Sequence, residues 1–308
     1  MRTLYDIQNK TLDIPLNKEQ YSSEINRTNP TAIVIMIDQS GSMGFVDVLY
    51  KGELKKYSVV VADMVNQTLN ELIGRCTKAE GVRNYFDVCI IGYGANGKEA
   101  NVIWEGNLKG QDWVTITDLK TNAKFIDKTV VTKIRGKEKQ TVKSVPYWFL
   151  PVSNNLTPMG NAFVQVYDLL FNWIDKHQNS YPPTIINITD GMQSDVSDDD
   201  LIKITDKIKD LNTKDGHALI LNCHISDNKN QVQFPLDEKE LLGLSHSSLL
   251  YKTASVMPMN YNAEISRLRN DNDIYNNYKG MAFNASMDTL FNLIDIGTTG
   301  VTRQLNTL

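Results

Sequence analysis

The length, composition and charge of the chain exclude several classes of protein. It has 308 residues, of which 41% are apolar and 22% are charged, the composition of a globular protein with a large core. Its net charge of −4 is too small to indicate nucleic acid or a membrane as a partner. No window approaches the roughly 18 consecutive apolar residues that a membrane-spanning helix needs.

The amino terminus and the cysteines indicate a cytoplasmic protein. Residues 1–6 contain no apolar signal core. Cys76, Cys89 and Cys223 are an odd number and lack the spacing of metal ligands, which argues against a disulfide scaffold. Cys223 is followed by His224, but neighbouring strand residues point to opposite faces, so we expect core packing and not a catalytic pair.

The first strong signal is an apolar run that ends in a polar loop. Residues 1–29 are predicted to form an N-terminal arm that either adds a strand or lies along the surface. Residues 31–37 are rich in β-branched side chains and predict a strand buried on both faces. The run ends at Asp38-Gln39-Ser40-Gly41-Ser42. Because parallel strands open into a ligand crevice at their carboxyl ends, these oxygens are placed to bind a ligand, and a single carboxylate with hydroxyls suits Mg²⁺.

The next elements continue an α/β pattern. Apolar residues recur at helical spacing from Tyr57 to Ile73, and residues 87–94 predict a second buried strand. Residues 99–104 alternate between polar and apolar, which fits a short antiparallel edge strand.

A segment at 107–150 is predicted to be an insertion that contains a β-hairpin. Residues 124–134 and 140–145 are strand-like, with a turn at 135–139. The segment holds nine Lys or Arg and four Asp or Glu, a net charge of +5. Two interpretations stay open: a solvated hairpin, or a recognition element that flanks the metal and contacts an acidic partner. In the second interpretation, the residues expected to contact the acidic partner are Lys133, Arg135, Lys137 and Lys139.

The rest of the chain supplies two more polar loops at the ends of regular elements. Leu156-Thr157-Pro158-Met159-Gly160 precedes a helix predicted from about Gly160 to His177, and the strand at 184–189 ends in Asp190-Gly191.

The last elements are predicted from their caps and apolar runs. Ser197 and Asp200 are typical of the start of a helix, here one that runs to Leu211 and whose first-turn acids complement its dipole. Residues 218–225 and 248–254 are predicted to be strands, and 285–294 the last helix. Residues 297–308 are predicted to be a polar tail.

These loops together resemble the metal-ion-dependent adhesion site (MIDAS) of the von Willebrand factor A (vWA) family. That site consists of an Asp-x-Ser-x-Ser loop, a distant Thr and a distant Asp, in this order. The resemblance covers residues 30–296 as one domain. It implies a three-layer α/β sandwich, with a mostly parallel, doubly wound sheet and one antiparallel edge strand.

The resemblance also assigns roles to single residues. Ser40 and Ser42 would bind the metal through their hydroxyls, and Thr157 directly or through water. Asp38 and Asp190 would hold metal-bound waters and balance the charge. The expected ion is Mg²⁺, with Mn²⁺ or Ca²⁺ as alternatives, and its open position would take an Asp or Glu carboxylate from a partner. No catalytic residue and no organic cofactor are assigned.

The function implied is that of an intracellular scaffold or adaptor which binds proteins through the metal. Among intracellular relatives, TerY-type proteins associate with a protein kinase and a protein phosphatase in bacterial stress systems, and others are partners of MoxR-type AAA+ ATPases. Neither nucleic acid nor a membrane is expected as a partner. The alternative is a Mg²⁺-dependent phosphoester hydrolase, although none of the four histidines lies in the polar loops.

Overall fold

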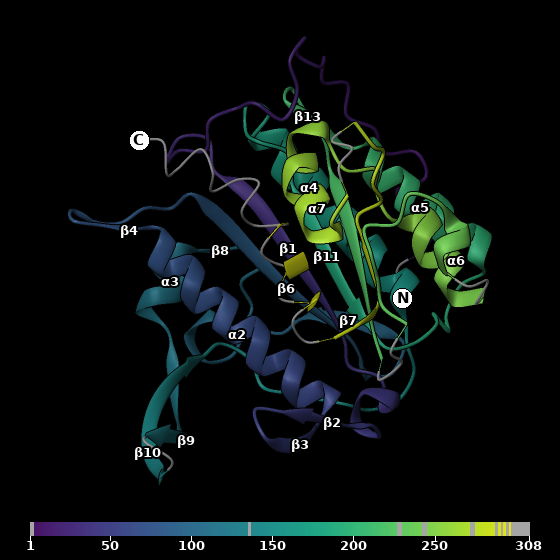
Figure 1. Ribbon diagram of the computed structural model, residues 1–308. Helices are drawn as coiled ribbons and strands as arrows, with labels where there is room; N and C mark the ends of the chain where they lie inside the picture. Colours follow the sequence, from purple (N-terminus) through teal and green to yellow (C-terminus); the bar gives the residue numbers. More distant parts are fainter. Residues whose placement is uncertain are drawn as a thin grey trace.

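The computed structural model is built around one large β-sheet (Figure 1). It describes residues 3–134, 137–226, 230–241, 245–271, 275–286, 289–290, 292–293 and 296, with backbone alone at 129–134, 137–139 and 245. The strand order is β15-β16-β14-β11-β1-β6-β7, and β8 pairs with β6 as well. The strands are β1 (Thr31–Asp38), β6 (Phe86–Asn96), β7 (Glu99–Val102), β8 (Val114–Thr115), β11 (Thr184–Thr189), β14 (Leu219–Ile225), β15 (Val232–Gln233) and β16 (Met281–Ala285).

The sheet is mostly parallel, which confirms the predicted fold class. β1 pairs in parallel with β6 and β11, and β11, β14 and β16 continue the parallel order. β7 is the expected antiparallel edge strand. β15 and β8 are two further antiparallel strands, and β8 lies inside the predicted insertion.

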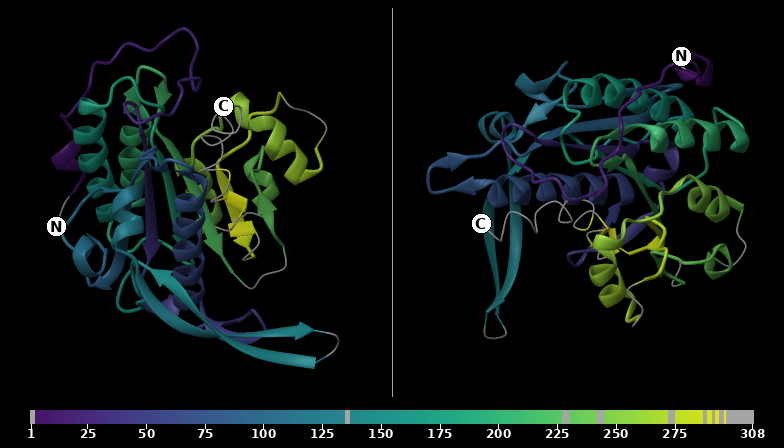
Figure 2. Two further views of the ribbon diagram at one scale, coloured as in Figure 1. Left: turned by 90° about the vertical axis from the view of Figure 1, so that its left-hand side faces the viewer. Right: turned by 90° about the horizontal axis from the view of Figure 1, so that it is seen from above.

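Helices cover both faces of the sheet, so the domain has three layers (Figure 2). In β1, Ile33, Ile35 and Ile37 pack in the core beneath α2, α3 and α7. Ala32, Val34 and Met36 point the other way, into the core beneath α1, α4, α5 and α6. The helices are α1 (Leu4–Ile7), α2 (Tyr57–Arg75), α3 (Ile116–Thr121), α4 (Met159–Lys176), α5 (Asp198–Asp210), α6 (Ser245–Thr253) and α7 (Asn262–Arg269). None in the described part of the chain is long and apolar enough to span a membrane.

The strand predicted at 248–254 is wrong, because residues 248–253 belong to helix α6. Leu249 and Leu250 are buried, while the side-chain amide of Asn222 on β14 donates to the carbonyl of Leu250 over 2.8 Å. The strand position beside β14 is taken by β16 instead, whose sequence Met-Ala-Phe-Asn-Ala has little β propensity. The predicted start of the last helix at Ala285 is wrong, because Ala285 is the last residue of β16. Residues 289–290, 292–293 and 296 are helical, as predicted for 285–294 in part.

The N-terminal arm lies along the surface, and within residues 3–29 it contributes no strand. The backbone N–H of Asn17 donates to the carbonyl of Lys214, and that of Tyr21 to the carbonyl of Asp215. Ile7, Ile14 and Ile25 are buried. Its boundary at residue 29 and that of the tail at 297, which lies outside the described residues, stay predictions.

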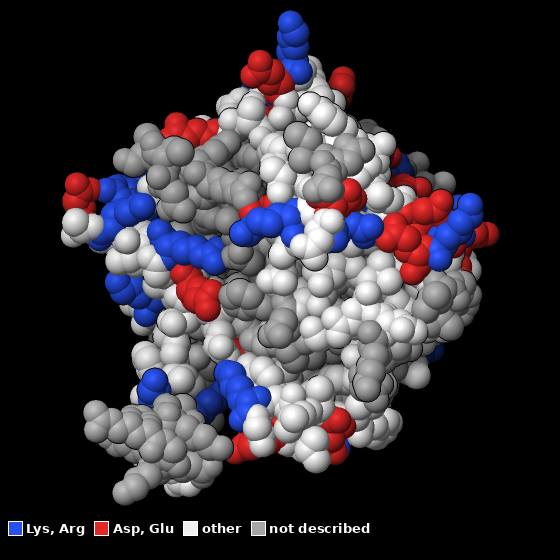
Figure 3. All heavy atoms as spheres, viewed as in Figure 1, with Lys and Arg blue, Asp and Glu red and all other residues white. Residues whose placement is uncertain are grey.

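Two hairpins are attached to the outer face of α2. The longer pairs β9 (Lys124–Ile134) with β10 (Lys137–Tyr147), and the shorter pairs β2 (Asp47–Tyr50) with β3 (Glu53–Lys56). The turn predicted at 135–139 is too long, because Lys137 already pairs with Ile134. The side chains of the four basic residues near the tip lie outside the described part, so their role in partner binding stays a prediction. On the face seen in Figure 3, basic and acidic side chains lie close to one another.

Asp63 on α2 joins both hairpins. Its carboxylate accepts hydrogen bonds from Tyr50 and Lys51 of the short hairpin, each over 2.9 Å, and from Lys128 of the long one. Burial alone would raise the pKa of Asp63, but the hydrogen bonds from Lys128, Lys51 and Tyr50 outweigh it and lower the pKa to about 2. The ionised form of Asp63 is therefore favoured by folding.

We expect Asp63→Asn to lower the free energy of unfolding at pH 7 by about 1 to 2 kcal/mol. Because folding lowers the pKa of Asp63, its contribution is present above about pH 4 and disappears as the pH falls toward 2. Urea unfolding of both proteins should therefore give free energies that converge below about pH 4. The control is Asp47→Asn, which removes an exposed ion pair with Lys56 and should cost less than about 0.5 kcal/mol. A constant difference between wild type and Asp63→Asn down to pH 3 would contradict the assignment.

Candidate metal centre

The candidate site lies where the strand order of the sheet reverses. From β1 the chain first adds β6 on one side and later adds β11 on the other. In an open parallel sheet, loops diverge at such a point and leave a crevice at the carboxyl ends of the strands. Asp38 is the last residue of β1, and Asp190 follows the last residue of β11. The fold thus brings the two predicted carboxylates to the same crevice.

The two serines of the first loop are in contact with each other and with Asp190. The hydroxyl oxygens of Ser40 and Ser42 are 3.0 Å apart. The hydroxyl of Ser42 also donates to a carboxylate oxygen of Asp190 over 2.7 Å. The short 3-10 helix η1 (Gly41–Gly44) turns the chain directly after Ser40 and so points both hydroxyls to the same side.

Asp38 lies beneath these hydroxyls and is fully buried. One of its oxygens accepts from the backbone N–H of Ser40 over 2.8 Å, and the other from the hydroxyl of Thr189 over 2.6 Å. Burial raises the pKa of Asp38 to about 6, and the nearby charge of Asp190 adds to the effect. Among the described residues, no salt bridge joins Asp38 to a cationic side chain. The buried carboxylate of Asp38 is therefore not balanced by a cationic side chain of the described residues, and an unbalanced buried charge costs free energy.

Thr157 faces the same cavity from the loop before α4. This cavity, of about 500 Å³, is lined by Ser40, Ser42 and Thr157 together with Phe45 and Leu156. All five predicted site residues therefore lie together: Asp38, Ser40, Ser42 and Asp190 are joined by hydrogen bonds, and Thr157 lines the same cavity as the two serines. Their identity as metal ligands stays a prediction.

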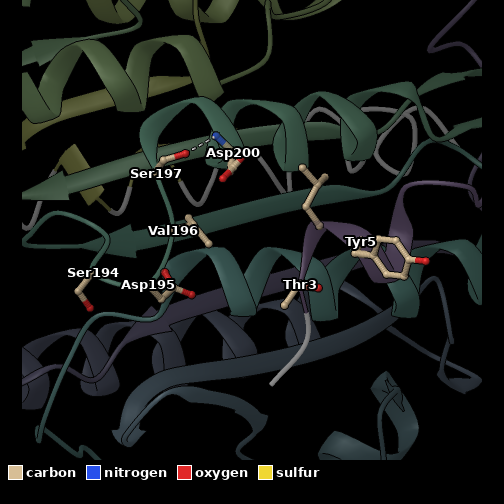
Figure 4. Close-up of a pocket in the computed structure, with 8 residues that line it drawn as sticks. Thr3, Tyr5, Ser194, Asp195, Val196, Ser197 and Asp200 are labelled. Carbon is tan, nitrogen blue, oxygen red and sulfur yellow. Dashed lines mark hydrogen bonds between the residues drawn. The ribbon is translucent and has the colours of Figure 1, made fainter.

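The loop after Asp190 holds the Thr157 loop in place through two residues that sequence reasoning missed. The N–H of Thr157 donates to the hydroxyl of Ser194 over 2.9 Å, and the N–H of Ser194 donates back to the carbonyl of Thr157. The carboxylate of Asp195 accepts from the N–H groups of Gly160 and Asn161 at the start of α4. Figure 4 shows Ser194 and Asp195 on the loop that leads into α5. Ser194 and Asp195 could not be identified from the sequence, because they lie in a polar loop that has no periodic apolar pattern.

The end of strand β6 also contacts two loops of the site, at Gly94. Gly94 has a φ of +113°, and a Cβ there would lie 2.5 Å from the carbonyl oxygen of Leu156 and 2.8 Å from the nitrogen of Ser40. The metal loop and the Thr157 loop also bond directly, since Gly41 N–H donates to the carbonyl of Asn155 over 3.1 Å. The close approach of β6 to the metal loop and the Thr157 loop therefore depends on the absence of a side chain at Gly94.

His224 is the histidine nearest to the site, as its strand position suggests. It pairs in register with Thr189, and its ring hydrogen-bonds to the backbone of Asp190. The ring stacks on Phe283 with centroids 4.5 Å apart, and burial, aided by His246, lowers its pKa to about 4. His224 is thus a neutral, packed side chain, and Cys223 beside it points into the core on the opposite face, as expected.

The residues present fit a small hard cation. In an octahedron with Mg–O distances of about 2.0 to 2.1 Å, neighbouring ligand oxygens are about 2.9 Å apart. The oxygens of Ser40 and Ser42 are 3.0 Å apart, and two uncompensated carboxylates lie beside them. Within the described residues no group of three or more His, Cys, Asp or Glu forms a metal cage. The donor set therefore resembles the few-carboxylate, water-rich environment that suits Mg²⁺ better than a calcium cage.

Comparisons with known proteins give no information about the site. No protein-family model matches the chain, and no curated protein matches it. Among solved structures, a von Willebrand factor type A protein from Catenulispora acidiphila matches with a TM-score of 0.41 and 12% identity. The match covers 93% of this chain and 48% of the other, so the chain spans about half the length of that protein.

Proposed function

We propose that this protein is a metal-dependent protein-binding module whose ion lies between the loops after β1, before α4 and after β11. The observation that carries the proposal is the fully buried carboxylate of Asp38, which has no cationic partner among the described side chains and lies directly under two hydroxyls. A buried charge of this kind is stabilised when an ion of opposite charge occupies the site. The adjoining cavity leaves room for a ligand from outside.

In this proposal the hydroxyls of Ser40, Ser42 and Thr157 hold the ion. Asp38 and Asp190 supply two negative charges, which balance a dication. When bound, the ion supplies a positive charge at the floor of the cavity, where a carboxylate from a partner is attracted. Because the protein itself offers few carboxylates there, an incoming Asp or Glu meets little competition.

The class of partner rests on the resemblance of the motif alone. A kinase, a phosphatase or an AAA+ ATPase is the partner expected for TerY-type and MoxR-associated proteins. Affinity capture from the native cell, with Mg²⁺ and with EDTA, identifies the partner as one that is lost on chelation.

Calorimetry with Mg²⁺, Mn²⁺ and Ca²⁺ on the purified protein tests the metal site. We expect one site per chain, with Mg²⁺ and Mn²⁺ bound more tightly than Ca²⁺, because the site offers too few oxygens for seven- or eight-fold coordination. Absence of binding at millimolar Mg²⁺ would refute the proposal, and preferential binding of Ca²⁺ would refute the assigned geometry.

The alternative function, Mg²⁺-dependent phosphoester hydrolysis, needs a base that activates Ser40, Ser42 or water. His224 is neutral and could accept a proton, but its ring is stacked on Phe283 and bonded to backbone groups. Hydrolysis of p-nitrophenyl phosphate with Mg²⁺ distinguishes the two functions, since turnover that is lost in Asp38→Asn would favour the hydrolase.

We expect Thr157→Ala to weaken Mg²⁺ binding while lowering the free energy of unfolding by less than about 1 kcal/mol. The hydrogen bonds of this loop to Ser194 come from the backbone of Thr157, so they survive the loss of the side chain. Calorimetry and urea unfolding measure the two effects.

Thr189→Val is the matched comparison for Thr157→Ala. It removes a buried hydroxyl that donates to Asp38 and should cost about 1 to 3 kcal/mol. If instead Thr157→Ala is the more destabilising change and leaves Mg²⁺ affinity intact, Thr157 is a structural residue.

A further inference from the structure

Each of the three loops that carry the predicted ligands also exposes a large apolar side chain within three residues of a predicted ligand. Phe45 follows Ser42 by three residues and is 80% exposed. Leu156 directly precedes Thr157 and is 49% exposed, and Met192 follows Asp190 by two residues and is 47% exposed. We call these three residues the apolar collar.

Two residues of the collar, Phe45 and Leu156, are linked to the site by more than sequence spacing. Phe45 and Leu156 line the same cavity as Ser40, Ser42 and Thr157. The ring of Phe45 lies over the metal loop, 3.6 Å from where a Cβ of Gly41 would stand. The carbonyl of Leu156 is held against Gly94, so the backbone that presents this side chain is packed. Exposed large apolar side chains gathered beside a cavity are a feature of protein-binding surfaces.

We propose, resting on the metal-dependent function above, that the partner presents a carboxylate flanked on both sides by large apolar residues. The carboxylate enters the cavity toward the ion, and its neighbours pack on Phe45, Leu156 and Met192. The charge of the centre selects an acidic residue, and the collar selects its apolar neighbours. Burial of apolar area against the collar also excludes water, which strengthens the contact between the carboxylate and the ion.

The test uses three synthetic pentapeptides with blocked ends: Gly-Leu-Asp-Phe-Gly, Gly-Ser-Asp-Ser-Gly and Gly-Leu-Asn-Phe-Gly. Their binding to the full chain in saturating Mg²⁺ is measured by NMR titration at millimolar peptide. We expect the Leu-Asp-Phe peptide to bind about tenfold more tightly than the Ser-Asp-Ser peptide, which corresponds to partial burial of two large side chains. The Leu-Asn-Phe peptide, which lacks the charge, should not bind.

A matched pair of variants locates the effect on the protein. Phe45→Ser should reduce the preference for Leu-Asp-Phe to about threefold or less. Leu54→Ser removes a side chain that is similarly exposed, at 71%, but belongs to β3 and does not line the cavity, so it should leave the preference unchanged. Because both residues are exposed, neither change should unfold the protein.

Several results would overturn the inference without touching the metal site. These are equal binding of the Leu-Asp-Phe and Ser-Asp-Ser peptides, no binding of either, or equal effects of Phe45→Ser and Leu54→Ser. Equal binding of the Asp and Asn peptides, or Mg²⁺-independent sedimentation with phosphatidylserine vesicles, would show an apolar surface unrelated to the ion and would also refute it. Failure of the proposed function is distinguished by calorimetry, which would then show no Mg²⁺ binding.

Discussion

We expect Asp38→Asn to weaken Mg²⁺ binding by about 10- to 100-fold, the range found when a residue that orients metal ligands is replaced. Asparagine keeps the size of the side chain and one acceptor oxygen for the N–H of Ser40, but it removes the negative charge beneath the ion. Calorimetry with Mg²⁺ measures the affinity of both proteins.

The same variant should be at least as stable as wild type when EDTA is present. Folding raises the pKa of Asp38 to about 6, so at pH 7 the buried, ionised carboxylate opposes folding when no ion is bound. This cost is relieved as the pH falls through 6, and the asparagine variant never carries it. Addition of Mg²⁺ should then raise the melting temperature of wild type and not of the variant.

Asp215→Asn is the control for Asp38→Asn, because Asp215 is also buried but holds the N-terminal arm through the N–H groups of Ser22 and Ser23. It should leave Mg²⁺ affinity unchanged. If Asp38→Asn binds Mg²⁺ like wild type, or destabilises the metal-free protein strongly, then Asp38 is a structural carboxylate and the metal proposal fails.

We expect Gly94→Ala to cost about 2 to 4 kcal/mol of the free energy of unfolding and to weaken Mg²⁺ binding as well. The new Cβ meets backbone atoms of Leu156 and Ser40, which cannot rotate away, so the two loops must separate. Urea unfolding and calorimetry on the same preparation measure both losses.

Gly97→Ala separates the two causes of that loss. Gly97 lies in the turn between β6 and β7 with a φ of +77°, but its Cβ would meet no atom within 4 Å. It should cost about 1 to 2 kcal/mol through backbone strain alone and leave Mg²⁺ affinity unchanged. Equal effects of the two changes would mean that the close approach of the loops at Gly94 contributes nothing.

The sequence by itself was sufficient to predict the elements whose pattern lies within one short segment. The apolar run of β1, the helical spacing of α2 and α4, and the N-cap Ser197 of α5 are each fixed by side chains within one element, and the structure confirms them. The short polar loops after β1 and β11 were also visible, because a carboxylate directly after a buried strand interrupts a clear pattern. Which of these residues bind metal stays a prediction.

Contacts between distant segments were decided only by the tertiary structure. Residues 248–254 were predicted to be a strand, yet 248–253 belong to α6, and β16 takes the sheet position beside β14. The contacts of Ser194 and Gly94 with the loop of Thr157 were also not predicted from the sequence. Neither was the contact of both hairpins with Asp63. Each depends on partners dozens of residues away, and local propensity carries no information about which segments will be neighbours once the core has packed.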